Sequence, residues 1–364
     1  MNQQELTQYN VGQNLDDLMN LDPRGYGVCR ILYPASRKLA GEPVTLHAAK
    51  KLTETIKEGS LVYILTGFVL IPSHCAETDG IISAMLLARA LVKAFGAKPV
   101  LVCAEENLPA VRSMASVVGL HLYETIEEMK KYPISMAVVP FMKDAEKAPA
   151  QADQILSHGI PSIIISTECA GANQKGVYHN AIGQATTEFE AKTDILFEKA
   201  QKKGVPTISI GDLGNELGLG TLGEHLNRYI PYAAPGACSC GCGGGLAVKT
   251  KADIVLTATV SNWGCYGLTA ALAFLKKDIG ILQDTELEKE AILAASHSGM
   301  VNMDGWLEPA VDGFDVEMNV LIVGLMRKCV DYALHYEHYN PGKTWFSKVL
   351  ELEFFKQSTS TVKE

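Results

Sequence analysis

Short apolar runs alternate with amphipathic stretches along most of the chain. The apolar runs lie at residues 61–67, 99–103, 136–139, 162–165, 205–210 and 254–260. Helical spacing of apolar residues fills the intervals, at residues 79–95, 108–118, 125–130, 188–203 and 263–276, with a further helix ending near residue 158. Strands that are apolar along their length and separated by helices are typical of a parallel sheet covered on both faces. With right-handed crossovers, this pattern predicts an α/β fold, a three-layer α/β/α sandwich with a mainly parallel sheet.

Both ends of the chain have a mainly helical pattern. This holds before residue 59 and after residue 284, and the longest helix is expected at residues 315–336. The sequence contains no internal repeat and no low-complexity linker. We therefore expect an N-terminal helical extension over residues 1–58, an α/β domain over residues 59–340 and a C-terminal tail over residues 341–364.

The loop after the run at residues 205–210 is the most informative stretch. Residues 211–220 read Gly-Asp-Leu-Gly-Asn-Glu-Leu-Gly-Leu-Gly. A strand that ends in a glycine-dense loop builds a ligand site at the carboxyl edge of an α/β sheet, because glycine lets the backbone approach a ligand closely. Asp212, Asn215 and Glu216 would supply acid, base or ligand groups there. The alternative is a tight connection made of ordinary turn residues.

Other predicted strands also end in polar loops. Thr66-Gly67 and Glu77-Thr78-Asp79-Gly80 follow the first strand, Thr167-Glu168 and a loop at residues 169–184 follow the fourth, and Ser261-Asn262-Trp263-Gly264 follows the sixth. Some of these residues have simpler interpretations, since Thr78 or Asp79 would cap a helix and Trp263 would pack in the core. In a parallel sheet these loops leave from one edge. We therefore expect the following side chains to converge: Glu77, Asp79, Glu168, His179, Asp212, Asn215, Glu216 and Asn262.

Such a cluster suits a small polar substrate, a hard cation, or both. Carboxylates crowded in a partly dry cleft raise one another's pKa, which produces a proton-transfer group near neutral pH.

Composition narrows the range of functions. The chain has 364 residues, 47% of them hydrophobic and 20% charged, and a net charge of −9. It has no basic stripe, which argues against nucleic-acid binding, and no apolar run of the roughly 18 residues that a membrane span needs. Residues 1–22 lack the features of a secretory or organelle signal. The nine cysteines are an odd number in a chain without a secretory signal, which indicates reduced thiols. We therefore expect a cytoplasmic protein.

Three of the cysteines lie close together. Cys238, Cys240 and Cys242 are separated by single residues in a glycine-rich segment. They would bind zinc or another soft metal, although zinc sites more often have two intervening residues and need a fourth ligand. The alternative is a flexible loop in which the thiols are incidental or redox-reactive.

The ordered set of motifs resembles the D-glutamate cyclase family. The motifs are Thr66-Gly67-Phe68, Glu77-Thr78-Asp79-Gly80, the loop at residues 211–220, Ser261-Asn262-Trp263-Gly264, Asp304-Gly305, Glu308-Pro309 and Val311-Asp312-Gly313. They extend over residues 66–330, in the family's order. The resemblance implies a carbon–oxygen lyase that converts D-glutamate to 5-oxo-D-proline and water. It also implies a small acidic amino acid as the substrate and no organic cofactor, and it leaves room for a divalent cation.

Two departures from the family pattern concern substrate recognition. Leu213 replaces a glycine of the family's Gly-Asp-Gly-Gly-Asn-Glu loop, and its side chain either narrows the pocket or points into the core. The family's Arg-Gly pair after a Tyr-x-Asn segment is also missing, since Ala181-Ile182-Gly183 follows Asn180 here. If that arginine holds a substrate carboxylate, recognition differs in this chain.

Cyclisation defines the roles of the candidate residues. The ammonium group must lose a proton to a base, Glu216 or Asp212, and the γ-carboxyl must be polarised by Glu77, by Glu168 or by a bound cation. Backbone N–H groups of Gly80 and Gly264 would hold the α-carboxylate, and Asn215 and Asn262 would stabilise the oxyanion. The remaining predicted binding residues are Thr66, Asp79, His179, Asn180, Gly214 and Trp263.

Two other functions stay open at this point. A nucleotide-binding enzyme would use the loop at residues 211–220 for phosphates, although this loop is not Gly-x-Gly-x-x-Gly and lacks a Walker lysine. A metal- or thiol-dependent protein that binds a small molecule would use Cys238 to Cys242. Nucleic-acid and membrane partners are not expected, and a homo-oligomer remains open.

Overall fold

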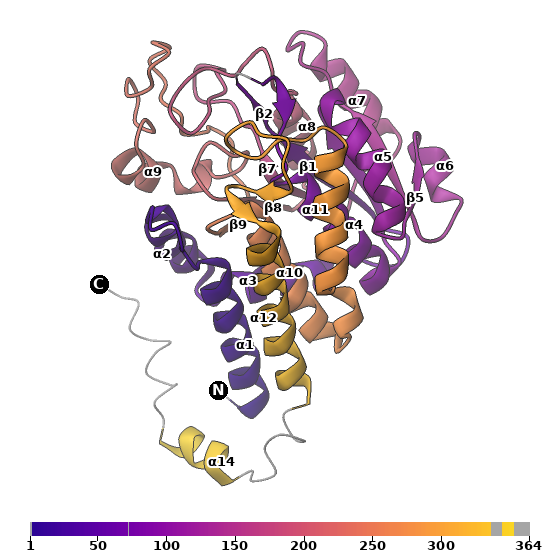
Figure 1. The fold of residues 1–364 in the computed structure, drawn as a ribbon, viewed down its shortest axis with the longest axis vertical. Helices are drawn as coiled ribbons and strands as arrows, with labels where there is room; N and C mark the ends of the chain where they lie inside the picture. The colour runs from indigo at the N-terminus through magenta and orange to yellow at the C-terminus, as the bar shows by residue number, and fades with distance from the viewer. Residues whose placement is uncertain (1, 72, 336–343, 353–364) are drawn as a thin grey trace.

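A seven-stranded parallel sheet forms the centre of the computed structural model, which describes residues 2–71, 73–335 and 344–352. The strands are β1 (Leu61–Gly67), β4 (Lys98–Cys103), β5 (His121–Tyr123), β6 (Ser135–Pro140), β7 (Ile163–Cys169), β8 (Thr207–Gly211) and β9 (Ile254–Thr257). They pair in the order β5-β6-β4-β1-β7-β8-β9. The order turns back at β1: the chain first adds strands on one side of β1 and then returns to place β7 on the other side. The predicted three-layer α/β/α sandwich is confirmed (Figure 1).

Helices cover both faces of the sheet. One face carries α4 (Ile81–Phe95), α5 (Leu108–Val117) and α10 (Ser261–Lys276). The other carries α6 (Ile126–Lys130), α7 (Ala148–Ser157), α8 (Thr193–Gln201) and α9 (Gly223–Tyr229). Side chains alternate along each strand between the two apolar cores, with Val62 and Ile64 of β1 facing the first and Tyr63 and Leu65 the second. Burial on both faces explains why these strands are apolar throughout.

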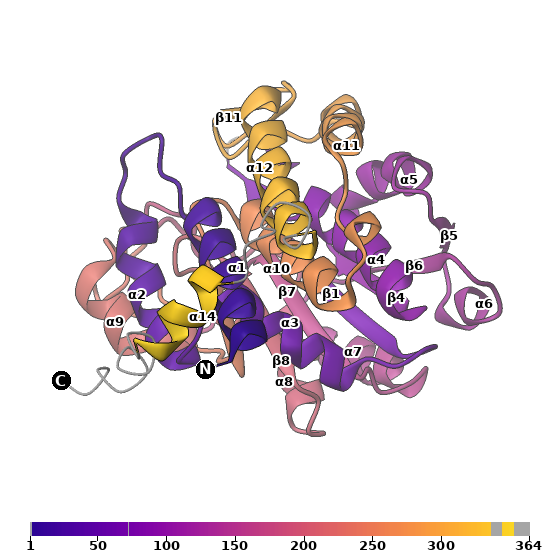
Figure 2. The same cartoon turned by 90° about the horizontal axis from the view of Figure 1, so that it is seen from below.

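The terminal helices pack on this framework. Helices α1 (Gln3–Met19), α3 (Val44–Thr55) and α12 (Val316–Leu334) contact α10, α2 (Val28–Ala40) lies against β9, and α11 (Thr285–His297) packs on α5 and α12. The loop that joins α1 to α2 extends to the same side of the molecule as strand β11 (Phe314–Asp315) (Figure 2). The boundaries 1–58, 59–340 and 341–364 stay a prediction. Most of the last segment lies outside the described residues, apart from helix α14 (Thr344–Glu351).

Several elements differ from the expectation at their ends. Strand β9 ends at Thr257 because the backbone N–H of Thr259 donates to Met19 at the end of α1 instead of continuing the sheet. Helix α8 begins at Thr193 rather than residue 188, after a turn in which Phe189 donates to Thr186. The short edge strand β5 was not predicted from the sequence. Among the described residues the longest helix is α12 (Val316–Leu334), as predicted, while residue 336, its expected end, lies outside them.

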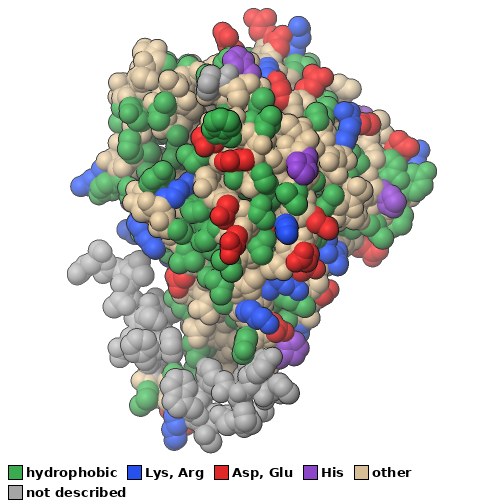
Figure 3. Space-filling view, in the orientation of Figure 1, with side chains coloured by type: hydrophobic (Ala, Val, Ile, Leu, Met, Phe, Trp, Pro, Cys, Tyr) green, Lys and Arg blue, Asp and Glu red, His purple; other side chains and the backbone are tan. Residues whose placement is uncertain are grey.

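Charged side chains of both signs are spread over the face shown in Figure 3. Lys and Arg side chains lie scattered among Asp and Glu on that face and do not form a continuous patch. Within the described residues, no helix is both long and apolar enough to cross a membrane.

The buried carboxyl group of Glu288 predicts a pH-dependent stability. Glu288 accepts hydrogen bonds from Tyr266 Oη (2.7 Å) and Gln283 Nε2 (3.2 Å), and burial raises the pKa of its carboxyl to about 7. Because the folded state holds this proton more tightly than the unfolded state does, the stabilisation is present below about pH 4.5 and is lost as the pH rises to about 7. The shift corresponds to on the order of 3 kcal/mol.

We therefore expect the free energy of unfolding of the Glu288→Gln variant, relative to wild type, to rise by this order between pH 4.5 and pH 7. Denaturant unfolding at a series of pH values measures it. Glu286→Gln, an exposed change in the same helix, is the control and should follow wild type. Parallel curves for wild type and Glu288→Gln would contradict the prediction.

Candidate functional site

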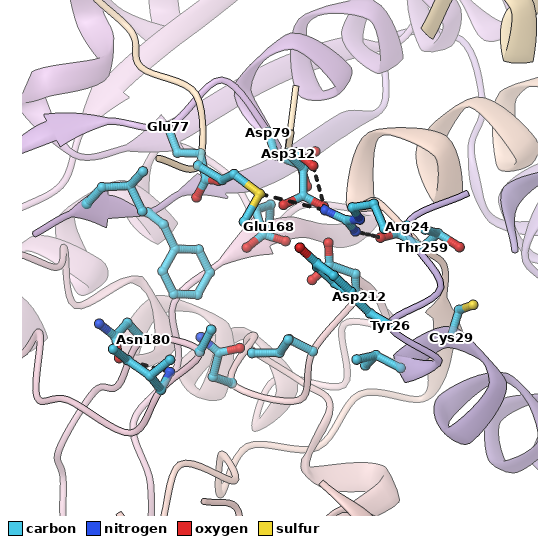
Figure 4. Close-up of a pocket in the computed structure, with 18 of the residues that line it drawn as sticks. Arg24, Tyr26, Cys29, Glu77, Asp79, Glu168, Asn180, Asp212, Thr259 and Asp312 are labelled. Atoms are coloured by element: carbon cyan, nitrogen blue, oxygen red, sulfur yellow. Dashed lines mark hydrogen bonds and ion pairs between the residues drawn. The ribbon is translucent and has the colours of Figure 1, made fainter. Parts of the chain in front are cut away.

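A cavity of about 470 Å³ lies at the carboxyl ends of β1, β7 and β8 (Figure 4). This is the point where the strand order turns back, which is the usual ligand site of open α/β sheets, and the volume falls in the usual range for small-molecule sites, roughly 300–1,000 Å³. The polar lining comes mainly from carboxylates, and these are Asp22, Glu77, Asp79, Glu168, Asp212 and Asp312. The loops at residues 67–71 and 73–80, 168–184 and 211–215 therefore open on one edge of the sheet, as predicted, and Met303 and Asp312 line the same cavity.

Two helices that begin at this edge cap each other. The carboxylate of Asp79, which precedes α4, accepts hydrogen bonds from the backbone N–H groups of Ser261 (3.1 Å) and Asn262 (2.9 Å) at the start of α10. In return, Asn262 Oδ1 accepts from the backbone N–H groups of Gly80 (2.9 Å) and Ser83 (3.3 Å) at the start of α4. These bonds satisfy backbone donors that a helix leaves free at its first turn. Asp79 also accepts from the backbone N–H of Gly80 (2.9 Å), so its carboxylate bridges the starts of α4 and α10, and Asn262 is a structural residue.

Glu168 reaches the cavity through an irregularity in β7. Thr66 pairs with Thr167 and Gly67 with Cys169, so Glu168 is an extra residue with φ 39° in the left-handed region. Such a bulge redirects a side chain at a cost of roughly 1–3 kcal/mol. Gly80 makes the close approach of α4 possible, because a Cβ there would lie 2.6 Å from Glu168 Cβ. The Glu168 carboxylate accepts a hydrogen bond from Ser261 Oγ at 2.6 Å.

The two acidic residues of the loop at 211–220 have different environments. The Glu216 carboxylate accepts hydrogen bonds from the backbone N–H groups of Asp212 (2.7 Å), Leu213 (2.6 Å) and Gly214 (2.6 Å), and it does not line the cavity. Glu216 therefore shapes the loop. Asp212 lines the cavity, and among the described residues no donor forms a hydrogen bond to its carboxylate. Of the two bases considered from the sequence, Asp212 is the one with access to a ligand.

A cation lies opposite these carboxylates. Arg24, from the loop between α1 and α2, forms an ion pair with Asp312 (2.9 Å) and donates to the backbone oxygen atoms of Asp312 (2.6 Å) and Thr259 (3.2 Å). Its guanidinium carbon lies 4.9 Å from the ring centre of Tyr26 and 4.7 Å from that of Phe314. Arg24 Nε is buried without a hydrogen-bond partner in the described part of the chain. The side chain is thus held in place with one donor unused.

The crowded carboxylates have raised pKa values. Burial, reinforced by the nearby Asp312, raises the pKa of Asp79 to about 7 and also raises that of Glu77. Burial is likewise the largest cause for Glu168 and Asp212, and the charges of their carboxylate neighbours add to it. Asp312 is affected less, with a pKa of about 6, because Arg24 offsets part of its burial. The site therefore holds exchangeable protons near neutral pH.

Three of these carboxylates could together hold a metal ion. One carboxylate oxygen from each of Asp79, Glu168 and Asp212 lies within 4.8 Å of the other two. Carboxylate oxygens are the ligands that Mg²⁺, Ca²⁺ and Mn²⁺ prefer. This donor set therefore fits the divalent cation for which the sequence leaves room.

Several predicted binding residues lie away from the cavity lining. Trp263 is fully buried and donates to Asn319 Oδ1 at 2.8 Å, so it packs in the core. The backbone N–H groups of Gly80 and Gly264 are already paired with protein acceptors and do not face a free anion site. Thr66 is buried beside Gly80, and the N–H of Gly214 is bound by Glu216.

The loop at residues 169–184 forms another wall. Asn180, Ala181, Ile182 and Gln184 line the cavity, and Asn215 Nδ2 donates to the backbone oxygen of His179 at 2.9 Å. The His179 side chain does not line the cavity and instead contacts Cys240 and Cys242 of the cysteine cluster. Leu213 lines the cavity, so of its two predicted orientations it takes the one that narrows the pocket.

The sequence interpretation missed the contribution of the N-terminal segment. Arg24 and Tyr26 belong to residues 1–58, which were expected to form an appended extension. Asp312 was part of a family motif but was not chosen as a site residue. The sequence does contain a signal for this contribution. The stretch Asp-Pro-Arg-Gly-Tyr-Gly at residues 22–27 is rich in turn residues, separates two helical patterns and carries an arginine.

Two comparisons with known proteins gave a match. A family model described as D-glutamate cyclase-like, C-terminal, matches residues 15–327. The human protein D-glutamate cyclase, mitochondrial, is 34% identical over 113 residues, which is 31% of this chain and 17% of the human protein. The aligned segment thus spans less than two thirds of either chain.

Proposed function

Since the chain belongs to the D-glutamate cyclase-like family, whose model matches residues 15–327, we propose that it is a lyase that converts D-glutamate to 5-oxo-D-proline and water. One observation supports the proposal beyond the family, and it is the set of groups in the cavity at the strand ends. The cavity combines the Asp212 carboxylate, which accepts no hydrogen bond within the described residues, with further carboxyl groups of raised pKa and the guanidinium of Arg24. A substrate with one ammonium and two carboxylate groups has a partner for each of them in this cavity.

Arg24 is the proposed anchor for the substrate's α-carboxylate. Its side chain lines the cavity, is 18% exposed and lies against the rings of Tyr26 and Phe314, and a guanidinium in this place suits a carboxylate ligand. This placement accounts for the absent Arg-Gly pair after Asn180, because the cation comes from the α1–α2 loop instead. Phe68 and Leu213 supply apolar wall for the methylene groups of the substrate.

Asp212 and Glu168 are the proposed proton-transfer pair. Asp212 takes one proton from the ammonium group and frees the nitrogen lone pair, and Glu168 gives a proton to the γ-carboxylate, which becomes a better electrophile. The nitrogen then attacks the γ-carbon. A second nitrogen proton passes to the leaving hydroxyl as the C–O bond breaks, so water departs and the lactam remains. Return of the proton from Asp212 to Glu168 completes the cycle.

A divalent cation would take the place of the Glu168 proton in polarising the γ-carboxyl, because a carboxylate that binds a metal ion is deprotonated. Asp79, Glu168 and Asp212 would hold it through their clustered oxygens. When bound, such an ion supplies Lewis-acid polarisation of a carboxyl oxygen. It would also offset the repulsion among the carboxylates, which outnumber Arg24 in the cavity.

The geometry supports a cyclase over a nucleotide-binding enzyme. The backbone N–H groups of residues 212–214, which would cradle a phosphate, are occupied by the Glu216 carboxylate. The excess of carboxylates also repels polyphosphate. We keep the cytoplasm as the proposed location.

The direct test incubates the purified protein with D-glutamate, L-glutamate and each enantiomer of 5-oxoproline, with and without Mg²⁺ or Mn²⁺. Chiral chromatography follows both directions. We expect interconversion of D-glutamate and 5-oxo-D-proline, and a much slower reaction of the L-enantiomers. If 5-oxoproline of neither hand is formed or opened with either cation present, the proposal is wrong although the family membership stands.

A further inference from the structure

Four side chains of the types that commonly bind metals, one histidine and three cysteines, meet outside the cavity. His179 lies in the loop at residues 169–184, and Cys238, Cys240 and Cys242 lie in a long irregular segment between α9 and β9. One ligand atom from each of the four lies within 4.8 Å of the others. The sequence showed three thiols without a fourth ligand, and the fold supplies that ligand from a position about 60 residues earlier in the chain.

The distances match a tetrahedral site. Cys238 Sγ lies 3.5 Å from Cys242 Sγ and 3.6 Å from Cys240 Sγ, and His179 Nε2 lies 3.2 Å from Cys240 Sγ and 3.6 Å from Cys242 Sγ. A zinc ion with ordinary Zn–S and Zn–N bonds separates its tetrahedral ligands by about 3.8 Å (S to S) and about 3.6 Å (N to S). The four ligand atoms are therefore spaced for an ion at their centre.

The surroundings also favour bound thiolate. Cys242 Sγ accepts hydrogen bonds from the backbone N–H of Gly244 (3.3 Å) and from Asn173 Nδ2 (3.4 Å). Donors of this kind orient and stabilise metal ligands. Gly241 has φ 75°, which lets the chain turn between Cys240 and Cys242 so that both thiols face inward.

We propose that His179, Cys238, Cys240 and Cys242 form a structural zinc site of the Cys₃His type. Four protein ligands complete the tetrahedron, so the site has no open position for catalysis. Its effect is to join the segment at residues 231–250 to the loop at 169–184. That loop lines the cavity through the residue next to His179, Asn180, and Ser239 Oγ adds a bond to the backbone oxygen of Gly183 at 3.1 Å. The ion would therefore fix one wall of the cavity without touching the substrate.

The first test measures metal in the protein as purified under reducing conditions. Mass spectrometry of the metal content should find about one zinc ion per chain. After chelation, Co²⁺ alone should restore occupancy and produce the visible absorption of thiolate-bound tetrahedral cobalt. Stripped, reduced protein that binds neither Zn²⁺ nor Co²⁺ at micromolar concentration would overturn the proposal. A disulfide among the three cysteines in the reduced preparation would also overturn it.

Variants then locate the ion. Cys240 is exposed, so Cys240→Ser should fold, yet it should lose more than about 100-fold in zinc affinity, because even partners outside the ligand set contribute roughly 10- to 100-fold. Cys329→Ser on α12 is the matched control and should keep the ion. Asp212→Asn should also keep it, which separates this site from the carboxylates of the cavity. Equal zinc content in Cys240→Ser and wild type would contradict the assignment, whatever the outcome of the cyclase assay.

Discussion

Replacing Asp212 with asparagine is expected to lower kcat for 5-oxoproline formation by roughly 10²- to 10⁴-fold, the usual loss when a general base is removed. Asp212 has no hydrogen-bond donor among the described residues, and its carboxylate faces the cavity beside Glu168. The amide keeps the size of the side chain but does not take the ammonium proton. The free energy of unfolding should not fall, because removing one member of a crowded acidic cluster relieves repulsion.

Two variants make this result specific. Asp153→Asn, at an exposed ion pair on α7, should leave kcat unchanged. Glu216→Gln should behave differently from Asp212→Asn, because an amide does not reproduce the carboxylate that accepts three backbone N–H groups, and both stability and activity should fall. Steady-state kinetics and thermal unfolding measure the two effects. A normal turnover number for Asp212→Asn would remove it from the mechanism.

Arg24→Gln is expected to raise KM for D-glutamate by about 10- to 100-fold, with a smaller effect on kcat. The estimate follows from the roughly 1.5–3 kcal/mol that a hydrogen bond to a charged group contributes. Arg24→Lys should recover only part of the affinity, because an ammonium keeps the charge but lacks the planar fork of donors. Calorimetric titration with 5-oxo-D-proline, the proposed product, should show the same order of affinities without depending on turnover.

Arg112→Gln provides the matched control. Arg112 pairs with Glu124 at the surface, where both side chains are more than half exposed, so the change should alter neither KM nor stability measurably. An unchanged KM in Arg24→Gln would show that the α-carboxylate binds elsewhere in the cavity.

The sheet could be predicted from the sequence because its signal is local. The run at residues 61–67 is β1 without a shift at either end, and alternation of apolar runs with helices was enough for the three-layer fold. The edge strand β5 has three residues, which is too short for a periodic pattern. Strand β9 ends early because of a bond to Met19 in α1, and no pattern near residue 257 reveals that partner.

For the site, sequence reasoning identified where the residues gather but not what each one contacts. Asp79, Glu168 and Asp212 do line one cavity, since parallel strands end at the same edge. The roles of Asn262 and Glu216 depend on which backbone N–H groups they meet, and residue type alone does not determine this. His179 was expected to bind substrate, and its position beside the cysteines became visible only with the fold.

The mutual capping of α4 and α10 has a consequence for how the protein is made. Asp79 and Asn262 are 183 residues apart, and Arg24 and Asp312 are 288 residues apart. A ribosome that adds about 5–20 residues per second needs roughly 10–40 s to proceed from Asp79 to Asn262. During that time α10 has not yet been synthesised, so the carboxylates of Glu77 and Asp79 remain hydrated. The cavity is therefore among the last parts of the chain to take shape during synthesis, after the first strands and helices have emerged.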